Sequence, residues 1–236
     1  MDIFSVNKKS IIAFITLLCL NFLAIYLSQN TYGFAIRALE SILCFILFLK
    51  LNKGTKGTLL ILIYSFFIIP EMLSLGNGIV ALYMLAIARI IRHVLIIIYI
   101  LSMINYKNKN RNLLVIISFV VLLNIYLAYI VLDLIKSNLF SDLHYIFMIA
   151  ESVLMLILGF LAALYGQGKN TEKSKCFMIA VFAFIFADVF FAVAFYANIQ
   201  PLFYLDSTLF LIGLIYLLKS TTILDDNSEN LNSLVN

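Results

Sequence analysis

The chain has 236 residues, of which 64% are hydrophobic and only 12% are charged, and its formal net charge is +4. Soluble domains average about 45–50% apolar and about 25% charged residues, so this composition excludes a soluble globular domain, a disordered chain and a nucleic-acid-binding module. It is typical of an all-α protein that crosses the membrane several times.

Eight apolar stretches follow one another along the chain, each close to the roughly 20 residues that a helix needs to cross the hydrocarbon core. The stretches are continuous, which excludes the short alternating strands of a β-barrel. The predicted spans are Ile11–Ser28, Phe34–Leu49, Thr58–Leu73, Ile79–Met103, Leu113–Ile135, Leu143–Tyr165, Phe177–Ala197 and Leu202–Leu218. We therefore predict one polytopic bundle of about eight transmembrane helices in residues 1–219 and a disordered tail in residues 220–236.

Basic residues alternate between the two ends of these spans. Twelve fall at the N-terminus, in every second loop or after the last span: Lys8, Lys9, Lys50, Lys53, Lys56, Lys107, Lys109, Arg111, Lys169, Lys173, Lys175 and Lys219. The intervening loops hold only Lys136. Because cytoplasmic loops carry the excess of Lys and Arg, both termini are predicted to be cytoplasmic, in the inner membrane of a bacterium.

Some ionisable residues fall within the spans or at their ends. They are Arg37, Glu40, Glu71, Arg89, Arg92, His93, Asp133, His144, Glu151, Asp188 and Asp206. A charge at the centre of a helix costs about 2.5–3.5 kcal/mol on insertion scales. The four most central residues, Arg89, Arg92, Glu151 and Asp188, would therefore together cost roughly 10–14 kcal/mol if they were unpaired. We expect such residues to face the bundle interior and to outline one polar cavity that opens outward.

Helical spacing indicates which of these residues share a face. Arg89, Arg92 and His93 stand at positions i, i+3 and i+4, so they project from the same side of the fourth span. Three potential cations on one buried face require acidic partners from other helices. Glu151 and Asp188 are the candidates.

The other ionisable residues in the spans also allow simpler, structural interpretations. Arg37 and Glu40 stand at i and i+3 and could form a structural pair that holds two helices together. Asp133, His144 and Asp206 are predicted near the membrane interface, where they could simply be hydrated.

The residues favour carboxylate chemistry over other reaction classes. No GxSxG elbow, phosphate-binding loop or dinucleotide fingerprint is present in the sequence. The only two histidines, His93 and His144, are about 50 residues apart and predicted at different depths, so we predict no metal site and no cofactor. Two buried acids with basic neighbours can divide the work, one holding a proton and one ionised, which suits an acid-labile bond and an activated water.

Three stretches resemble the YhhN-like lysoplasmalogenase family of eight-span membrane proteins. The fourth span reads LAIARIIRHVLII from Leu85 to Ile97, similar to the family's helix that ends in His-hydrophobic-hydrophobic-Tyr. The seventh reads FIFADVFFAV from Phe184, similar to Phe-x-x-Ser-Asp-x-x-Leu-Ala. Arg37-Ala38 stands where the family tends to have Lys-Pro, and Pro70-Glu71 where it has Gly-Asp.

The resemblance implies hydrolysis of the vinyl-ether bond of a lysoplasmalogen, which gives a fatty aldehyde and a glycerophospho-alcohol. By the same resemblance, Asp188 and Glu71 would form the acid/base pair. Arg37 would hold a phosphate or tune an acid, and His93 would orient a group or shuttle a proton. The supporting or substrate-binding residues that we expect also include Glu40, Arg89, Arg92, Glu151 and Asp206.

The same residues are also compatible with three functions other than a hydrolase. Buried arginines and acids also serve small-molecule or proton-coupled transporters, and a non-catalytic lipid-sensing protein would keep them too. A membrane subunit whose charges pair with a partner chain is a third interpretation. In the hydrolase interpretation the partner is a membrane lipid or lysolipid, and we expect no nucleic acid.

Overall fold

The structure is a computed structural model that describes residues 8–27, 30–51, 57–76, 78–104 and 111–223. All regular structure in these ranges is α-helical, which confirms the predicted class. The helices are α1 (Lys8–Tyr26), α2 (Asn30–Leu51), α3 (Thr58–Leu73), α4 (Ile79–Met103), α5 (Arg111–Lys136), α6 (Asp142–Lys169), α7 (Glu172–Tyr196) and α8 (Leu202–Thr222). Two predicted spans coincide with α3 and α4, and the others differ by a few residues at their ends.

Local signals in the sequence set several of these helix ends. Ser141 caps α6, because its side chain accepts a hydrogen bond from the backbone N–H of His144 at 3.1 Å. The helix ends at Lys169 and is capped by Asn170, which adopts a left-handed conformation with φ of 48°. A capping box between Thr171 and Ser174 then starts α7. A sharp turn therefore joins α6 to α7 and places them side by side.

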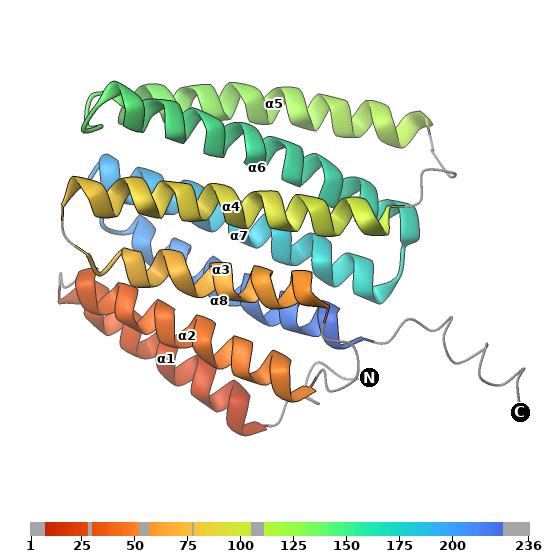
Figure 1. The fold of residues 1–236 in the computed structure, drawn as a ribbon. Helices are drawn as coiled ribbons and strands as arrows, with labels where there is room; N and C mark the ends of the chain where they lie inside the picture. The colour runs from red at the N-terminus through yellow and green to blue at the C-terminus, as the bar shows by residue number, and fades with distance from the viewer. Residues whose placement is uncertain (1–7, 28–29, 52–56, 77, 105–110, 224–236) are drawn as a thin grey trace, which may run out of the picture.

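The helices form a bundle in which most sequence neighbours pack together, whereas α6 lies between α4 and α5 (Figure 1). The most extensive packing joins α7 to α8, and α4 packs against both α3 and α6. Helix α2 also packs on α8, although the two are far apart in the sequence. Helix α5 lies at one edge of the bundle and packs on α6 and α7. These contacts join the helices that carry the buried ionisable residues, which are α2, α3, α4, α6, α7 and α8.

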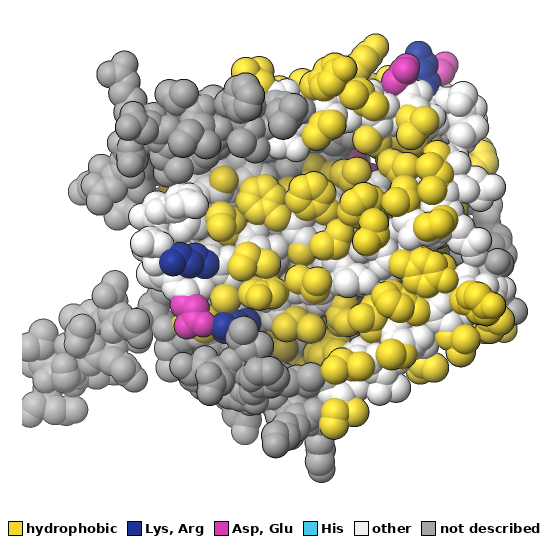
Figure 2. Space-filling view, turned by 180° about the vertical axis from the view of Figure 1, so that it is seen from behind, with side chains coloured by type: hydrophobic (Ala, Val, Ile, Leu, Met, Phe, Trp, Pro, Cys, Tyr) yellow, Lys and Arg dark blue, Asp and Glu magenta, His cyan; other side chains and the backbone are white. Residues whose placement is uncertain are grey.

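The outer surface of the bundle is apolar. Hydrophobic side chains cover most of the face in Figure 2, and charged side chains lie near its edges. Val80 on α4 is 70% exposed and Tyr129 on α5 is 66% exposed. Within the described residues, α4, α6, α7 and α8 are each long and apolar enough to cross a membrane. The chain is thus a helical membrane protein.

Aromatic rings fill the core where α3, α7 and α8 meet. The ring centroids of Phe67 and Phe184 are 4.3 Å apart, and that of Phe210 lies 6.0 Å from Phe184. Phe184 approaches α8 closely because Gly213 has no side chain: a Cβ there would come within 2.5 Å of the Phe184 ring. These closely packed rings lie next to the ionisable residues described below.

Some residues used to predict the topology are not among those that the structure describes. Lys53, Lys56, Lys107 and Lys109, which contribute to the orientation argument, lie outside the described residues, as do residues 224–236 of the predicted tail. Helix α8 continues to Thr222, past the predicted end of the last span.

Candidate functional site

The structure buries every ionisable residue that the sequence nominated for the site. Each is at most 4% exposed: Arg37, Glu40, Glu71, Arg89, Arg92, His93, Glu151, Asp188 and Asp206. They come from α2, α3, α4, α6, α7 and α8. Burial of so many ionisable groups in an apolar bundle requires that they compensate one another.

Arg37 holds together the first group of these residues, which we call the Arg37 cluster. Its guanidinium donates from Nη2 to Glu71 Oε1 at 3.0 Å and from Nη1 to Asp206 Oδ2. The guanidinium also lies over the Phe210 ring, 4.2 Å from its centroid. One cation on α2 thus joins carboxylates from α3 and α8, and an aromatic face adds a cation–π contact.

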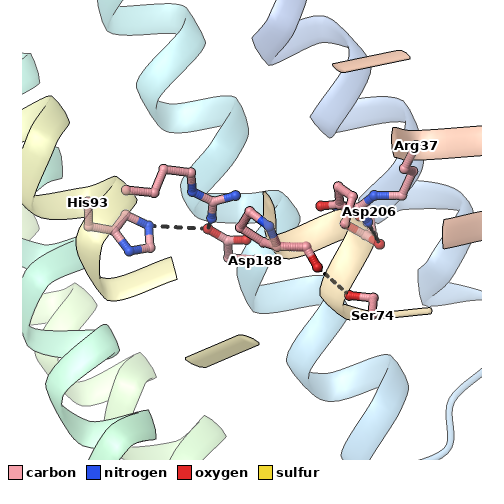
Figure 3. Close-up of polar contacts among 8 residues, drawn as sticks. Arg37, Ser74, His93, Asp188 and Asp206 are labelled. Carbon is pink, nitrogen blue, oxygen red and sulfur yellow. Dashed lines mark hydrogen bonds and ion pairs between the residues drawn. The ribbon is translucent and has the colours of Figure 1, made fainter. Parts of the chain in front are cut away.

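Asp188 is the centre of a second group. Arg92 donates from Nη2 to Asp188 Oδ2, and His93 Nε2 lies 3.2 Å from the same oxygen (Figure 3). The Arg92 guanidinium lies 5.1 Å from the centroid of the Phe67 ring. The expectation that Asp188 would pair with the basic face of α4 is therefore confirmed.

Arg89 and Glu151 complete what we call the Asp188 cluster, together with Arg92, His93 and Asp188. Arg89 interacts electrostatically with both Glu151 and Asp188. The Arg89 guanidinium stacks on the Phe191 ring at 4.0 Å from its centroid. Glu151 Oε1, in contrast, is buried without a hydrogen-bond partner in the described part of the chain.

The two clusters form one polar layer across the bundle. Asp188 and the pair of Arg37 and Asp206 lie on neighbouring helices in Figure 3. Arg37 also interacts electrostatically with Asp188, and Asp206 with Arg89. In a low-dielectric interior such interactions are poorly screened, so a change of charge in one cluster changes the electrostatic energy of the charges in the other.

A cavity of about 480 Å³ adjoins the Asp188 cluster. It lies between α5, α6 and α7 and extends along α6 from Met148 to Gln167. Most of its described lining is aliphatic or aromatic, and the polar exceptions are Arg89, Asn124, Glu151, Ser152, Gln167 and Asp188. The arrangement combines a long apolar space with three ionisable groups, a form that fits an amphiphilic molecule.

Three sequence interpretations are wrong. Asp206 is not hydrated at an interface but is 1% exposed and bonded to Arg37. His144 is equally buried, and its Nε2 lies 2.9 Å from the Tyr196 hydroxyl. Arg37 pairs with Glu71 and Asp206 rather than with Glu40, whose two carboxyl oxygens have no hydrogen-bond partner among the described residues. The i, i+3 relation placed Arg37 and Glu40 on nearby positions but could not show which helix faces the guanidinium.

Other outcomes agree with the sequence or refine it. Asp133 is exposed, as expected. Pro70 lies inside α3, and its carbonyl accepts from both the backbone N–H and the hydroxyl of Ser74 at 2.9 Å. This local bonding, of which Figure 3 shows the bond made by the Ser74 hydroxyl, holds the turn of α3 that carries Glu71.

Sequence reasoning missed the aromatic partners of the buried cations. Phe67, Phe191 and Phe210 each lie under one arginine, but nothing distinguishes them in a chain with 21 phenylalanines. Tyr196, which bonds to His144, was also missed. A helical-wheel comparison of α7 would not have singled out Tyr196, because it lies eight residues after Asp188 and so about 80° away around the helix.

One atom from each of His93, Glu151 and Asp188 could reach a common cation, since all three atoms lie within 4.8 Å of one another. The two histidines weighed from the sequence as metal ligands were His93 and His144, but His144 is not part of this group. Arg89 and Arg92 already place two positive charges beside these two carboxyl groups. The cluster therefore has no surplus negative charge to attract a divalent ion, although its geometry would admit one.

Comparisons of this chain with protein-family models, with curated proteins and with solved structures find no match.

Proposed function

We propose that the protein is a membrane hydrolase that cleaves the vinyl-ether bond of a lysoplasmalogen-type lysolipid. The observation that carries the proposal is the position of Asp188. It lies on an apolar cavity, is buried in a helical membrane protein, and is bonded to Arg92 and next to His93. The resemblance of the sequence around Asp188 and His93 to the lysoplasmalogenase family points to the same reaction.

The chemistry of a vinyl ether needs a proton donor and a proton acceptor. Protonation of the carbon–carbon double bond gives an oxocarbenium ion, which water attacks, and the resulting hemiacetal separates into an aldehyde and an alcohol. Arg92 and His93 favour the ionised form of Asp188 by contacting its Oδ2. Asp188 is therefore suited to accept the proton of the attacking water, and its contacts with Arg92 and His93 keep it oriented.

The apolar part of the cavity would hold the hydrocarbon chain of the lysolipid. A bilayer is as apolar as this cavity, so transfer of the chain from the membrane supplies little binding energy. Selectivity would thus come from the polar lining, where Arg89 is the group suited to a phosphate. Arg37, to which the resemblance gave that role, already donates to two carboxylates and is not among the described residues that line the cavity.

The membrane topology belongs to the same proposal. We place eight spans in the bacterial inner membrane with both termini in the cytoplasm, as the alternation of basic residues predicts. The Asp188 cluster would then lie near the middle of the membrane, and Tyr196 and His144 would lie toward the outside. A lysolipid would enter sideways from the bilayer between α5 and its neighbours.

The test compares purified protein with an Asp188→Asn variant on a vinyl-ether lysolipid and on the saturated ether of the same chain and head group. The wild type is expected to release aldehyde from the vinyl ether only, and the variant to release at least 100-fold less, the lower range for loss of a proton-transferring group. Equal release by the two proteins would remove Asp188 from the mechanism. No aldehyde from the wild type would contradict the proposed activity itself.

A further inference from the structure

The cavity separates the two acids that could serve as the partner of Asp188. Glu151 and Asp188 both line it, whereas Glu71 is not among its described lining residues. Glu71 lies on α3, and the helices that form most of the cavity wall are α5, α6 and α7. A molecule bound in the cavity would therefore contact Glu151 and Asp188 together.

The two acids also differ in how firmly they are held. Glu71 Oε1 accepts from Arg37 at 3.0 Å, in a cluster where Arg37 also holds Asp206. Glu151 is 2% exposed, and its Oε1 has no hydrogen-bond partner among the described residues. A buried oxygen with no partner is costly unless a ligand, a water or a proton satisfies it. Oε1 of Glu151 is thus available to a molecule in the cavity, whereas Oε1 of Glu71 already accepts a hydrogen bond from Arg37.

The distance between Glu151 and Asp188 suits a shared reaction centre. One oxygen of each carboxyl group and one nitrogen of His93 lie within 4.8 Å of one another. A hydrogen bond between oxygen atoms spans about 2.7–2.8 Å, so one water or one substrate atom can contact both carboxyl groups. This is the arrangement that a proton donor and a proton acceptor on one substrate require.

We infer that Glu151, rather than Glu71, is the second catalytic carboxyl group, and that it acts as the proton donor. The inference rests on the proposed hydrolase function. The Glu151 carboxyl group transfers its proton to the outer carbon of the vinyl ether, the carbon–carbon π bond breaks, and an oxocarbenium ion forms. Water adds to the carbon that bears the ether oxygen, and Asp188 takes one proton from that water, which gives the hemiacetal.

The second half of the reaction restores both residues. Asp188 returns its proton to the ether oxygen as the carbon–oxygen bond breaks, which releases the glycerophospho-alcohol. The hemiacetal hydroxyl loses its proton to Glu151 and becomes the aldehyde. One water is consumed, no oxidant or reductant is needed, and both carboxyl groups regain their starting protonation.

Glu71 has a different task in this scheme. It and Asp206 balance the charge of Arg37 and join α2, α3 and α8. Glu71 is thus a structural partner, and its loss should appear first in stability.

The experiment measures kcat, KM and thermal stability of Glu151→Gln, Glu151→Asp and Glu71→Gln in detergent with a vinyl-ether lysolipid. Glu172→Gln makes the same chemical change on an exposed residue outside the cavity and is the matched control for kcat and KM. Glu151→Gln is expected to lower kcat by about 10²–10⁴-fold with little change in KM, and Glu151→Asp to recover part of the rate. Glu71→Gln is expected to lower the melting temperature with a smaller effect on kcat.

The outcomes separate this inference from the proposed function. If Glu151→Gln folds and releases aldehyde at the wild-type rate, the inference is overturned and the hydrolase proposal stands. The same holds if Glu71→Gln abolishes release at an unchanged melting temperature and Glu151→Gln does not. If Glu151→Gln fails to fold, the rate of Glu151→Asp decides: a rate equal to that of an Ala variant at this position overturns the inference. A wild type without any aldehyde release overturns both proposals.

Discussion

Asp188 shows how a buried charge is kept in an apolar bundle. Its Oδ2 is contacted by Arg92 and His93 from one turn of α4, and Phe67 lies against the Arg92 guanidinium. In such an environment the cost of desolvation is large, and each partner is needed to offset it. Removal of one partner should therefore be worse than removal of both.

An Arg92→Met variant tests this account of the ion pair. We expect it to lower the free energy of unfolding by about 3–5 kcal/mol, because it leaves the Asp188 carboxylate buried with only His93 in contact with Oδ2. The measurement is thermal or denaturant unfolding in detergent. The double variant Arg92→Met with Asp188→Asn should be more stable than Arg92→Met alone, and a double variant that loses the sum of both single effects would contradict the account.

A further ion pair lies at the end of the bundle, outside the predicted spans. Lys219 Nζ lies 2.6 Å from Glu172 Oε1, and this contact lowers the pKa of Glu172 below its usual 4.5 and raises the pKa of Lys219 above its usual 10.5. A lowered acid pKa means that the native state holds the carboxylate form more strongly than the unfolded state does. The contribution is then complete above pH 4.5 and disappears as the pH falls through the lowered value.

The matched pair of wild type and Glu172→Gln reports this effect. The difference between their melting temperatures should be constant from pH 6 to 8 and should shrink steadily in acid below pH 4.5. High salt should reduce the difference, since Glu172 is exposed. A difference that grows on acidification would have the wrong sign for this ion pair.

At the scale of the helices, close packing between α7 and α8 supports the polar layer. Gly213 on α8 gives room to the Phe184 ring on α7, and that ring packs on Phe67 and Phe210, which lie under Arg92 and Arg37. A shift of Phe184 would therefore be passed to both clusters.

Gly213→Ala is expected to lower stability by about 1–3 kcal/mol, because the added Cβ would come within 2.5–2.9 Å of three atoms of the Phe184 ring. Gly168→Ala on α6 is the control, since a Cβ there meets nothing within 4 Å and alanine favours the helix. Melting temperatures of both variants, measured together with lysolipid hydrolysis, give the comparison. A Gly213→Ala variant as stable as Gly168→Ala would show that α7 and α8 do not pack as described.

The helices and their shared faces could be predicted from the sequence, but their partners could not. The grouping of Arg89, Arg92 and His93 follows from 3.6 residues per turn, and the pairing with Asp188 follows from the need to neutralise them. The Arg37 contact to Asp206 depends on α2 packing against α8, which is a property of tertiary packing. The cavity likewise arises from how α5 packs against α6 and α7, which no helical pattern specifies.

For the whole molecule, the unequal distribution of lysines gives a test of topology. In a cysteine-free background, Lys136→Cys in whole cells should react with a membrane-impermeant thiol reagent added outside. Lys173→Cys should react only after the cells are permeabilised, because its loop carries the basic residues expected in the cytoplasm. Labelling of both positions from the same side would contradict a membrane crossing between them and with it the proposed topology.

The most direct test of the central claim, that this bundle hydrolyses a vinyl ether at Asp188, is an isotope measurement in water enriched in ¹⁸O. Attack of water on the vinyl carbon leaves the original oxygen on the glycerophospho-alcohol, so the wild type should release this product without ¹⁸O, and Asp188→Asn should release at least 100-fold less of it. A glycerophospho-alcohol that carries ¹⁸O, or equal release by the two proteins, would contradict the claim.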